Sequence, residues 1–344
     1  TLTTGIDTVA GTSSTINGII SDGTGEQTWA LTDSITGTTG TTDIVNARII
    51  GDATAGVTRT GLQTSAVETI SFNYSDANDA ADSNTISASG FTGITKLAVA
   101  GSSNVNTTST VRDTVAFTGV ATGVALELGS NTAQTSVTLT NTGTATTGDA
   151  VTLNTVGGSS GVVTLRDANT TEGFVTVNIA TSGSTASTIK SLDAGTSNTT
   201  VNVTGDQALT ITDALASNVK TLYASKASGA ITASVVAAST LVVKGGSAIT
   251  DVLGLTVDSS VTSGAVITGF ETVNLNTTGT GTIDSGLFTG ATAINVTSDA
   301  ATNTSLTIQN AAAGQALNFV GSKSTLANQT FDPVTQSLKT NNTA

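Results

Sequence analysis

The stretch at residues 267–308 reads ITGFETVNLNTTGTGTIDSGLFTGATAINVTSDAATNTSLTI, and it decides the fold. Three short segments within it, at 273–275, 294–296 and 306–308, alternate apolar and polar residues. This alternation places the apolar side chains on one face of a β-strand. Glycine, threonine, asparagine and serine fill the spaces between the segments, and such residues favour turns. The stretch therefore predicts short strands joined by tight turns.

The same pattern continues along most of the chain, where apolar pairs begin at intervals of roughly 8 to 14 residues. No exact repeat unit is visible, so the repeat is degenerate. Many segments are only three residues long, whereas strands of β-sandwiches usually have about five or six. The sequence predicts an all-β fold, a parallel β-solenoid or β-helix-like structure with short irregular coils. Tandem β-sandwiches are the alternative.

The chain divides into three predicted regions. Residues 1–60 form an N-terminal β segment that contains the single Trp, and residues 61–327 form the solenoid body. Residues 328–344 lose the pattern and contain the single Pro, so they are predicted to be a C-terminal tail. Two single turns of helix are expected at 213–218 and 311–314, where a Gly or Asn follows alanine-rich residues.

Composition limits the classes of partner. The 344 residues include 24 acidic and 11 basic side chains, which gives a net charge of −13. No basic stripe is present to bind phosphates, so nucleic acid is excluded, and anionic membranes are disfavoured as a direct partner. No apolar run reaches the roughly 18 residues of a transmembrane helix. The sequence therefore predicts no transmembrane segment.

The chain also lacks the residues of common catalytic sites. It has no His and no Cys, which excludes His-assisted nucleophiles, cysteine chemistry and His/Cys zinc sites. A glycosidase needs two converging carboxylates, usually with sugar-binding aromatic rings, and aromatics are only 3% here. We predict that the protein is not an enzyme. A polysaccharide-active β-helix remains an alternative, as does an ice-binding face built from the Thr-rich stretch at 138–147.

Calcium is the predicted cofactor, because it binds carboxylate, amide and carbonyl oxygens on turns. The densest set of such groups lies at 76–84, and its candidate ligands are Asp76, Asn78, Asp79 and Asp82. A solvated acidic loop is the alternative for this segment. Asp33 with Asp43, and Asp167 with Glu172, are further candidate pairs.

Isolated acids on turns have a simpler interpretation. Asp149, Asp206 and Asp251 each stand alone on a predicted turn. A carboxylate in this position usually accepts a backbone N–H of the turn. We predict that these three residues are turn caps.

The first 50 residues resemble a known family. LTTGIDTVAGTSSTING at 2–18 is similar to the LTTG-x-D-x-x-x-GT segment of RTX-type S-layer proteins, which Gram-negative bacteria export through type I secretion systems. WALTDSITGTTGTTDIVNARI at 29–49 resembles their L-x-x-x-D-x-I-x-G-G-x-G-x-D-x-L segment, and VETI at 67–70 and FETV at 270–273 resemble their (I/F)-E-x-(I/V) strands. Residues 13–16 depart from the family's G-N-D-T, and the glycine/aspartate turn is reduced to 37–43.

The resemblance implies a solenoid-rich domain that assembles with calcium into a two-dimensional lattice. It implies RTX-like loops in residues 1–60, with Asp7, Asp33 and Asp43 as candidate calcium ligands, and attachment to lipopolysaccharide or a surface glycan through another region. We therefore predict a secreted structural protein of the cell surface that associates with itself as an S-layer. An extracellular adhesin or a surface-filament subunit is the alternative.

Overall fold

The computed structural model describes residues 1–10, 15–21, 27–38, 40, 42–51, 56–76, 81–103, 113–131, 135–143, 149–168, 171–297, 306–320 and 330–331. Their regular secondary structure consists of β-strands, apart from a short 3-10 helix at Ser285–Leu287. Every strand pair given for these residues is parallel, with neighbours one coil apart. The predicted parallel β-solenoid is confirmed. The sandwich alternative is wrong, since sandwich sheets are antiparallel.

The chain forms two compact units, Thr1–Asn198 and Thr199–Ala344. The first unit has three parallel sheets. The first sheet contains β2 (Thr15–Ser21), β4 (Ile44–Gly51), β7 (Thr69–Asp76), β10 (Lys96–Ser103), β12 (Ala125–Ser130), β14 (Ala150–Thr155) and β16 (Thr176–Thr181). The second contains β5 (Thr58–Arg59), β8 (Ser83–Ser87), β11 (Asp113–Val120), β13 (Thr135–Asn141), β15 (Gly158–Arg166) and β17 (Ser187–Asp193). The third contains β1 (Thr8–Ala10), β3 (Ser34–Thr36), β6 (Thr64–Ser65) and β9 (Phe91–Thr92).

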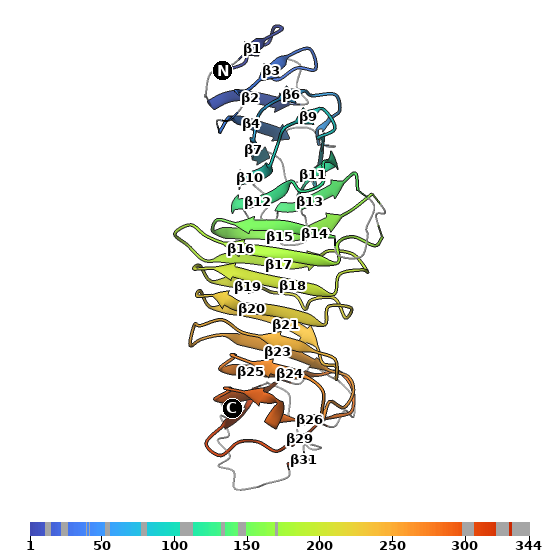
Figure 1. The fold of residues 1–344 in the computed structure, drawn as a ribbon, viewed down its shortest axis with the longest axis vertical. Helices are drawn as coiled ribbons and strands as arrows, with labels where there is room; N and C mark the ends of the chain where they lie inside the picture. Colours follow the sequence, from blue (N-terminus) through green and yellow to red (C-terminus); the bar gives the residue numbers. More distant parts are fainter. Residues whose placement is uncertain are drawn as a thin grey trace. The chain divides into compact units, whose positions relative to one another are not determined.

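The second unit repeats this design with its own strands, which Figure 1 shows as successive stacked arrows. One face contains β18 (Thr200–Gly205), β20 (Thr221–Ala227), β22 (Val242–Lys244), β24 (Val266–Thr268) and β27 (Phe288–Thr289). The other contains β19 (Leu209–Ile211), β21 (Ile231–Val236), β23 (Val252–Val257), β25 (Thr272–Thr277), β28 (Ala293–Thr297) and β30 (Ala316–Val320). A short third sheet joins β26 (Gly281–Asp284), β29 (Leu306–Gln309) and β31 (Thr330–Phe331).

The core of each unit is a set of ladders in which one apolar side chain per coil stacks on the next. In the first unit Val45, Ile70, Leu97, Leu126 and Leu153 are register partners on successive strands, and all are fully buried. Burying one such side chain contributes about 1.5–3 kcal/mol. Because each coil supplies only part of its own core, the stacking of neighbours completes it.

The outer face carries a polar ladder in the second unit. The Asn295 side-chain amide donates to Asn274 Oδ1 at 2.8 Å, and the Asn318 amide donates to Asn295 Oδ1 at 2.8 Å. These three residues occupy one register position on β25, β28 and β30. The ladder joins three coils through side chains in addition to the backbone hydrogen bonds.

The edge of β2 in the first unit is covered by the chain around it. Leu2 N–H donates to Asn17 O at 2.8 Å, and Trp29 N–H donates to Ile19 O at 3.0 Å. Trp29 is fully buried and stacks on Phe91 with ring centroids 5.7 Å apart. An exposed strand edge is a template for unwanted pairing, so these contacts blunt this edge.

Both predicted turns of helix are wrong. Residues 213–218 and 311–314 are turns and irregular backbone. Leu215 is buried and its N–H donates to Ser234 O at 2.8 Å, so the backbone bonds to the next coil instead of forming a helical turn. Gly314 has a φ of +81°, a left-handed conformation that a right-handed helix does not contain. The division into 1–60, 61–327 and 328–344 stays a prediction.

Candidate functional site

The acidic residues occupy repeated positions at the starts of strands. In four places, the carboxylate of one residue accepts the backbone N–H of an acidic residue one coil earlier. These pairs, with N–O distances, are Asp33 with Asp7 (2.9 Å), Glu68 with Asp43 (2.8 Å), Asp113 with Asp82 (3.1 Å) and Glu271 with Asp251 (2.9 Å). We call this arrangement the stacked acidic turn. It brings two acidic residues of successive coils together because the coils stack in parallel.

The first stacked acidic turn is fully engaged with its own backbone. Asp33 is buried, and its second oxygen accepts Ala30 N–H at 2.7 Å. The Asp7 carboxylate accepts the Thr3 N–H at 2.6 Å and the Thr3 hydroxyl at 3.1 Å. Both carboxylates therefore close turns. The structure pairs Asp33 with Asp7, whereas the sequence paired Asp33 with Asp43.

Asp251 shows the same arrangement in the second unit. It is fully buried, and its two oxygens accept Ile231 N–H at 2.8 Å and Gly246 N–H at 2.7 Å. Burial raises the pKa of this carboxyl above its ordinary value, and the nearby Glu271 carboxylate raises it further, although the two N–H groups oppose the shift. Asp251 therefore caps a turn, as predicted, through Gly246 N–H. Its second donor, Ile231 N–H, lies twenty residues earlier on the preceding coil.

Two of these turns contain a glycine that cannot be replaced by a larger residue without a steric clash. A Cβ on Gly37 would lie 1.9 Å from Ala66 O and 2.6 Å from Asp43 Oδ2. A Cβ on Gly245 would lie 1.7 Å from Gly269 O and 3.1 Å from the Asp251 carboxylate. The chain of the next coil passes directly over each of these glycines, so any side chain there would push two coils apart.

A different set of acids gathers inside the first unit. Asp76, Asp82 and Asp113 are 4%, 2% and 0% exposed, and they come from the end of β7, the residue before β8 and the first residue of β11. Tyr74 is 2% exposed, and its pKa is raised well above its ordinary value, first by burial and then by the charges of these three carboxylates. We call these four residues the Tyr74 cluster.

The Tyr74 cluster changes the interpretation of the acidic segment at 76–84. Asp76 and Asp82 are buried, so the alternative of a solvated acidic loop is wrong for these two residues. Asn78 and Asp79 lie outside the described residues. Asn84 is also buried, and its Oδ1 accepts Val57 N–H at 2.9 Å. Sequence reasoning missed Asp113, which is 31 residues from Asp82.

The candidate pair Asp167 and Glu172 occupies two different environments. Asp167 is buried and accepts Gly173 N–H at 3.1 Å, while Glu172 is exposed. Within the described ranges, no group of three or more His, Cys, Asp or Glu side chains has an arrangement that would hold a metal ion by itself. Calcium at any described site would therefore need hydroxyl, amide, carbonyl or water oxygens as well.

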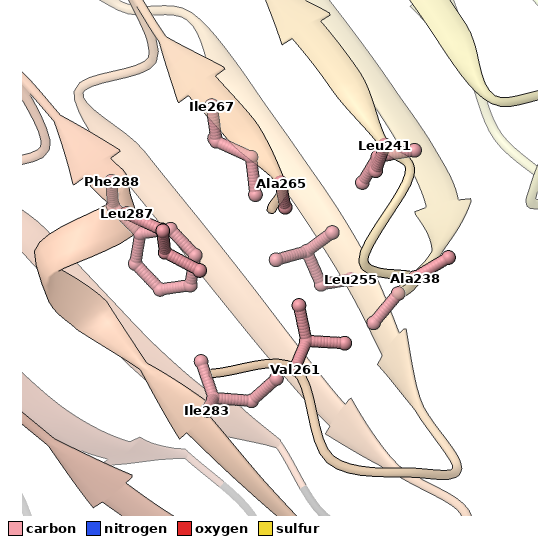
Figure 2. A pocket seen from close by; sticks show the side chains of 10 residues that line it. Ala238, Leu241, Leu255, Val261, Ala265, Ile267, Ile283, Leu287 and Phe288 are labelled. Atoms are coloured by element: carbon pink, nitrogen blue, oxygen red, sulfur yellow. The ribbon is translucent and has the colours of Figure 1, made fainter. Parts of the chain in front are cut away.

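The interior of the second unit contains an apolar cavity (Figure 2). The volume open to the centre of a water-sized sphere is about 10 Å³, enough for about one water molecule. Its lining is wholly apolar: Ala237, Ala238, Leu241, Leu255, Val261, Ala265, Ile267, Ile283, Leu287 and Phe288. An apolar cavity of this size stays dry, so it is a packing defect and not a ligand site.

Two shallow depressions adjoin on the outer face of the first unit, and both are lined by Arg48 and Asn73. Their volumes are about 280 and 330 Å³. The remaining lining is mostly serine, asparagine, glycine and threonine, and neither lining contains a carboxylate. These depressions do not supply the two carboxylates that glycoside hydrolysis requires.

No family model, curated protein or solved structure matches the chain. Within the described residues, no helix has the length and apolar character needed to cross a membrane.

Proposed function

We propose that the chain is a secreted structural protein that assembles with copies of itself into a layer on the cell surface. The observation that carries this proposal is the parallel solenoid, whose core is filled by stacked apolar ladders. The described cavity in the second unit is too small for a ligand, and the described depressions of the first unit lack carboxylates. Such a chain offers mainly regular outer faces, which suit repeated contacts between copies.

The sequence adds support from the resemblance of residues 2–18 and 29–49 to RTX-type S-layer proteins. The two (I/F)-E-x-(I/V) segments of that resemblance contain Glu68 and Glu271, which both accept an N–H in a stacked acidic turn. The same local geometry therefore recurs at both of these segments. Anchoring to lipopolysaccharide or a surface glycan through another region belongs to the same proposal.

Calcium is proposed to assist the assembly, and the Tyr74 cluster is the best described location for it. Asp76, Asp82 and Asp113 all act on buried Tyr74 through their charges, and a cation beside these carboxylates would offset the repulsion among like charges. Asp33 and Asp251 fit calcium less well, because their oxygens already accept backbone N–H groups. Asp76, Asp82 and Asp113 would supply carboxylate oxygens, which are the ligands that calcium prefers.

Negative-stain electron microscopy of the purified chain, first with millimolar calcium and then with EGTA, tests the function. Ordered sheets that dissolve in EGTA would support calcium-assisted assembly. Sheets that are indifferent to EGTA would keep the structural role and remove calcium from it. Separate rods under both conditions would contradict self-assembly and favour the adhesin alternative.

Terbium luminescence tests the calcium site without depending on assembly. Terbium binds calcium sites, and a nearby tyrosine sensitises its emission. The chain has two tyrosines, Tyr74 and Tyr223, so each can be tested separately. We expect Tyr74→Phe to abolish most of the sensitised emission and Tyr223→Phe to leave it unchanged. Equal emission from both variants would contradict calcium binding at the Tyr74 cluster.

A further inference from the structure

Charge is distributed unequally between the two units. Thr1–Asn198 holds 16 acidic and 6 basic residues, a net charge of −10. Thr199–Ala344 holds 8 acidic and 5 basic residues, a net charge of −3. Copies of a chain with this net charge repel one another over long range, so close association needs a local surface that offsets the repulsion.

The described cations of the first unit have polar partners inside that unit. Lys96 forms an ion pair with Glu127 at 2.9 Å, and Arg166 forms one with Asp193. Although burial opposes it, the Arg166 guanidinium and the Gly195 N–H hold the pKa of Asp193 below its ordinary value. Both cations are therefore paired with carboxylates of the same unit.

Two further arginines of the first unit make polar contacts in the same way. Arg48 donates to Ser75 Oγ at 3.1 Å. Arg59 donates to Gln27 and to the Ser21 carbonyl. These contacts leave little of the first unit's positive charge free to meet another molecule.

The described cations of the second unit differ. Lys220 lies directly before β20, Lys226 is exposed on β20, and Lys244 lies on β22. None of the three forms an ion pair with a described carboxylate. Lys244 Nζ lies 5.4 Å from the ring centroid of Tyr223, which is its register partner on β20. Three lysines and a tyrosine therefore share two neighbouring strands.

The surrounding face is partly apolar. Val242 and Val266 are register partners on β22 and β24 and point outward, and Val266 is 43% exposed. At about 3.3 Å per strand residue, the six steps from Lys220 to Lys226 span about 20 Å. We call the face formed by Lys220, Tyr223, Lys226, Lys244 and Val266 the lysine face.

We propose that the lysine face binds the acidic Thr1–Asn198 unit of a second copy of this chain. The lysines of this face and the excess of acidic residues in Thr1–Asn198 give complementarity between unlike surfaces, so each copy can bind one neighbour with its lysine face and another with its acidic unit. Tyr223 and Val266 add apolar contact to this face, and aromatic residues are favoured in interfaces. This inference rests on the proposed self-assembly and names the contact that produces it.

Carboxyl-to-amine crosslinking of assembled protein tests the contact directly. Chains grown in ¹⁴N and ¹⁵N media are mixed, assembled and treated with a zero-length carbodiimide, and mixed-isotope peptides then mark links between copies. We expect mixed-isotope links from Lys226 or Lys244 to acidic residues within 1–198. Links from these lysines found only within single chains, or only to residues 199–344, would overturn the proposal.

A pair of charge-matched variants supplies the second measurement. Lys226→Gln/Lys244→Gln and Thr278→Glu/Thr280→Glu each bring the net charge from −13 to −15, and the two threonines are exposed beyond β25, away from the lysine face. We expect the lysine variant to raise the critical assembly concentration by about fivefold or more, since surface ion pairs are lost at every contact. The threonine variant should change it by less than about twofold. Equal effects would overturn the lysine face as a contact.

The outcomes separate this inference from the proposed function. If wild-type chain never assembles, the proposed function fails and this contact fails with it. If wild-type and lysine variant assemble equally well, only the lysine face is wrong. If the lysine variant assembles normally but loses binding to an anionic polysaccharide such as heparin, the face is a glycan site and the proposal is overturned.

Discussion

Replacing Asp251 by alanine tests whether stacked acidic turns hold the coils together. The substitution leaves the N–H groups of Ile231 and Gly246 buried without their acceptor. Each unsatisfied buried donor costs about 1–3 kcal/mol, so two cost about 2–6 kcal/mol. The substitution also removes the cost of burying the Asp251 charge, which the raised pKa of this carboxyl reflects. This gain offsets part of the loss. We therefore expect a loss of about 2–4 kcal/mol in the free energy of unfolding.

The pH dependence of the same site has a definite sign. The pKa of Asp251 is raised in the folded protein, chiefly by burial and also by Glu271. The stability from this carboxyl is fully present below its unfolded pKa, which is about 3.9, and it is lost as pH rises through the folded pKa. Asp251→Asn does not titrate. The stability of wild type relative to Asp251→Asn should therefore fall as pH rises above about 4.

Urea unfolding followed by far-UV circular dichroism measures both effects. Asp258→Asn is the matched control, because Asp258 is exposed at the end of the same strand, β23. We expect this control to change the free energy of unfolding by less than about 0.5 kcal/mol. Hydrogen exchange at the Ile231 and Gly246 amides should accelerate in Asp251→Ala. Unchanged exchange at both amides, or equal losses in the alanine variant and the control, would refute the reasoning.

Two further substitutions test the coil stacking. Asn295→Ala removes hydrogen bonds to Asn274 and Asn318, and we expect a loss of about 1–2 kcal/mol in urea unfolding. The half-buried Asn46 side chain makes no hydrogen bond to another described residue, so Asn46→Ala should cost less than about 0.5 kcal/mol. Gly245→Ala places a Cβ 1.7 Å from Gly269 O, and we expect at least about 3 kcal/mol of destabilisation by thermal unfolding, whereas wild-type stability in this variant would contradict the close approach.

The sequence predicted the fold because strand alternation is a local property. Val273 and Leu275 are buried on β25 as the alternation requires, and the polar residue between them, Asn274, points outward. The coil length was not predicted, because it varies. Register partners are 25 residues apart at Ile44 and Thr69, but only 21 at Thr221 and Val242. Variable turns absorb this difference, so no fixed period appears in the sequence.

The candidate site was harder to predict because its contacts join different coils. Asp7 was chosen from a resemblance, Asp33 and Asp43 were chosen from their positions in the sequence as well, and the structure places each of the three in a stacked acidic turn. Asp113 was missed, since its partner Asp82 is distant in sequence and no exact repeat aligns the two. A local signal was nevertheless present. An acidic residue directly before, or at the start of, an alternating strand recurs at Asp43, Asp113 and Asp251.

A stack of coils also predicts how far the damage from one broken turn should spread. Each coil contacts its neighbours, so stability is a sum of coil and interface contributions. The Asp251 carboxylate accepts a hydrogen bond from Ile231 on the preceding coil. Among the described contacts, none of its hydrogen bonds involves a residue of the first unit. Asp251→Ala should therefore accelerate hydrogen exchange around β21 and β23, while amides of the Leu97 and Leu126 strands keep their protection. Equal acceleration in both units would show that the chain unfolds as one cooperative body, and the sum over coils would then be the wrong description.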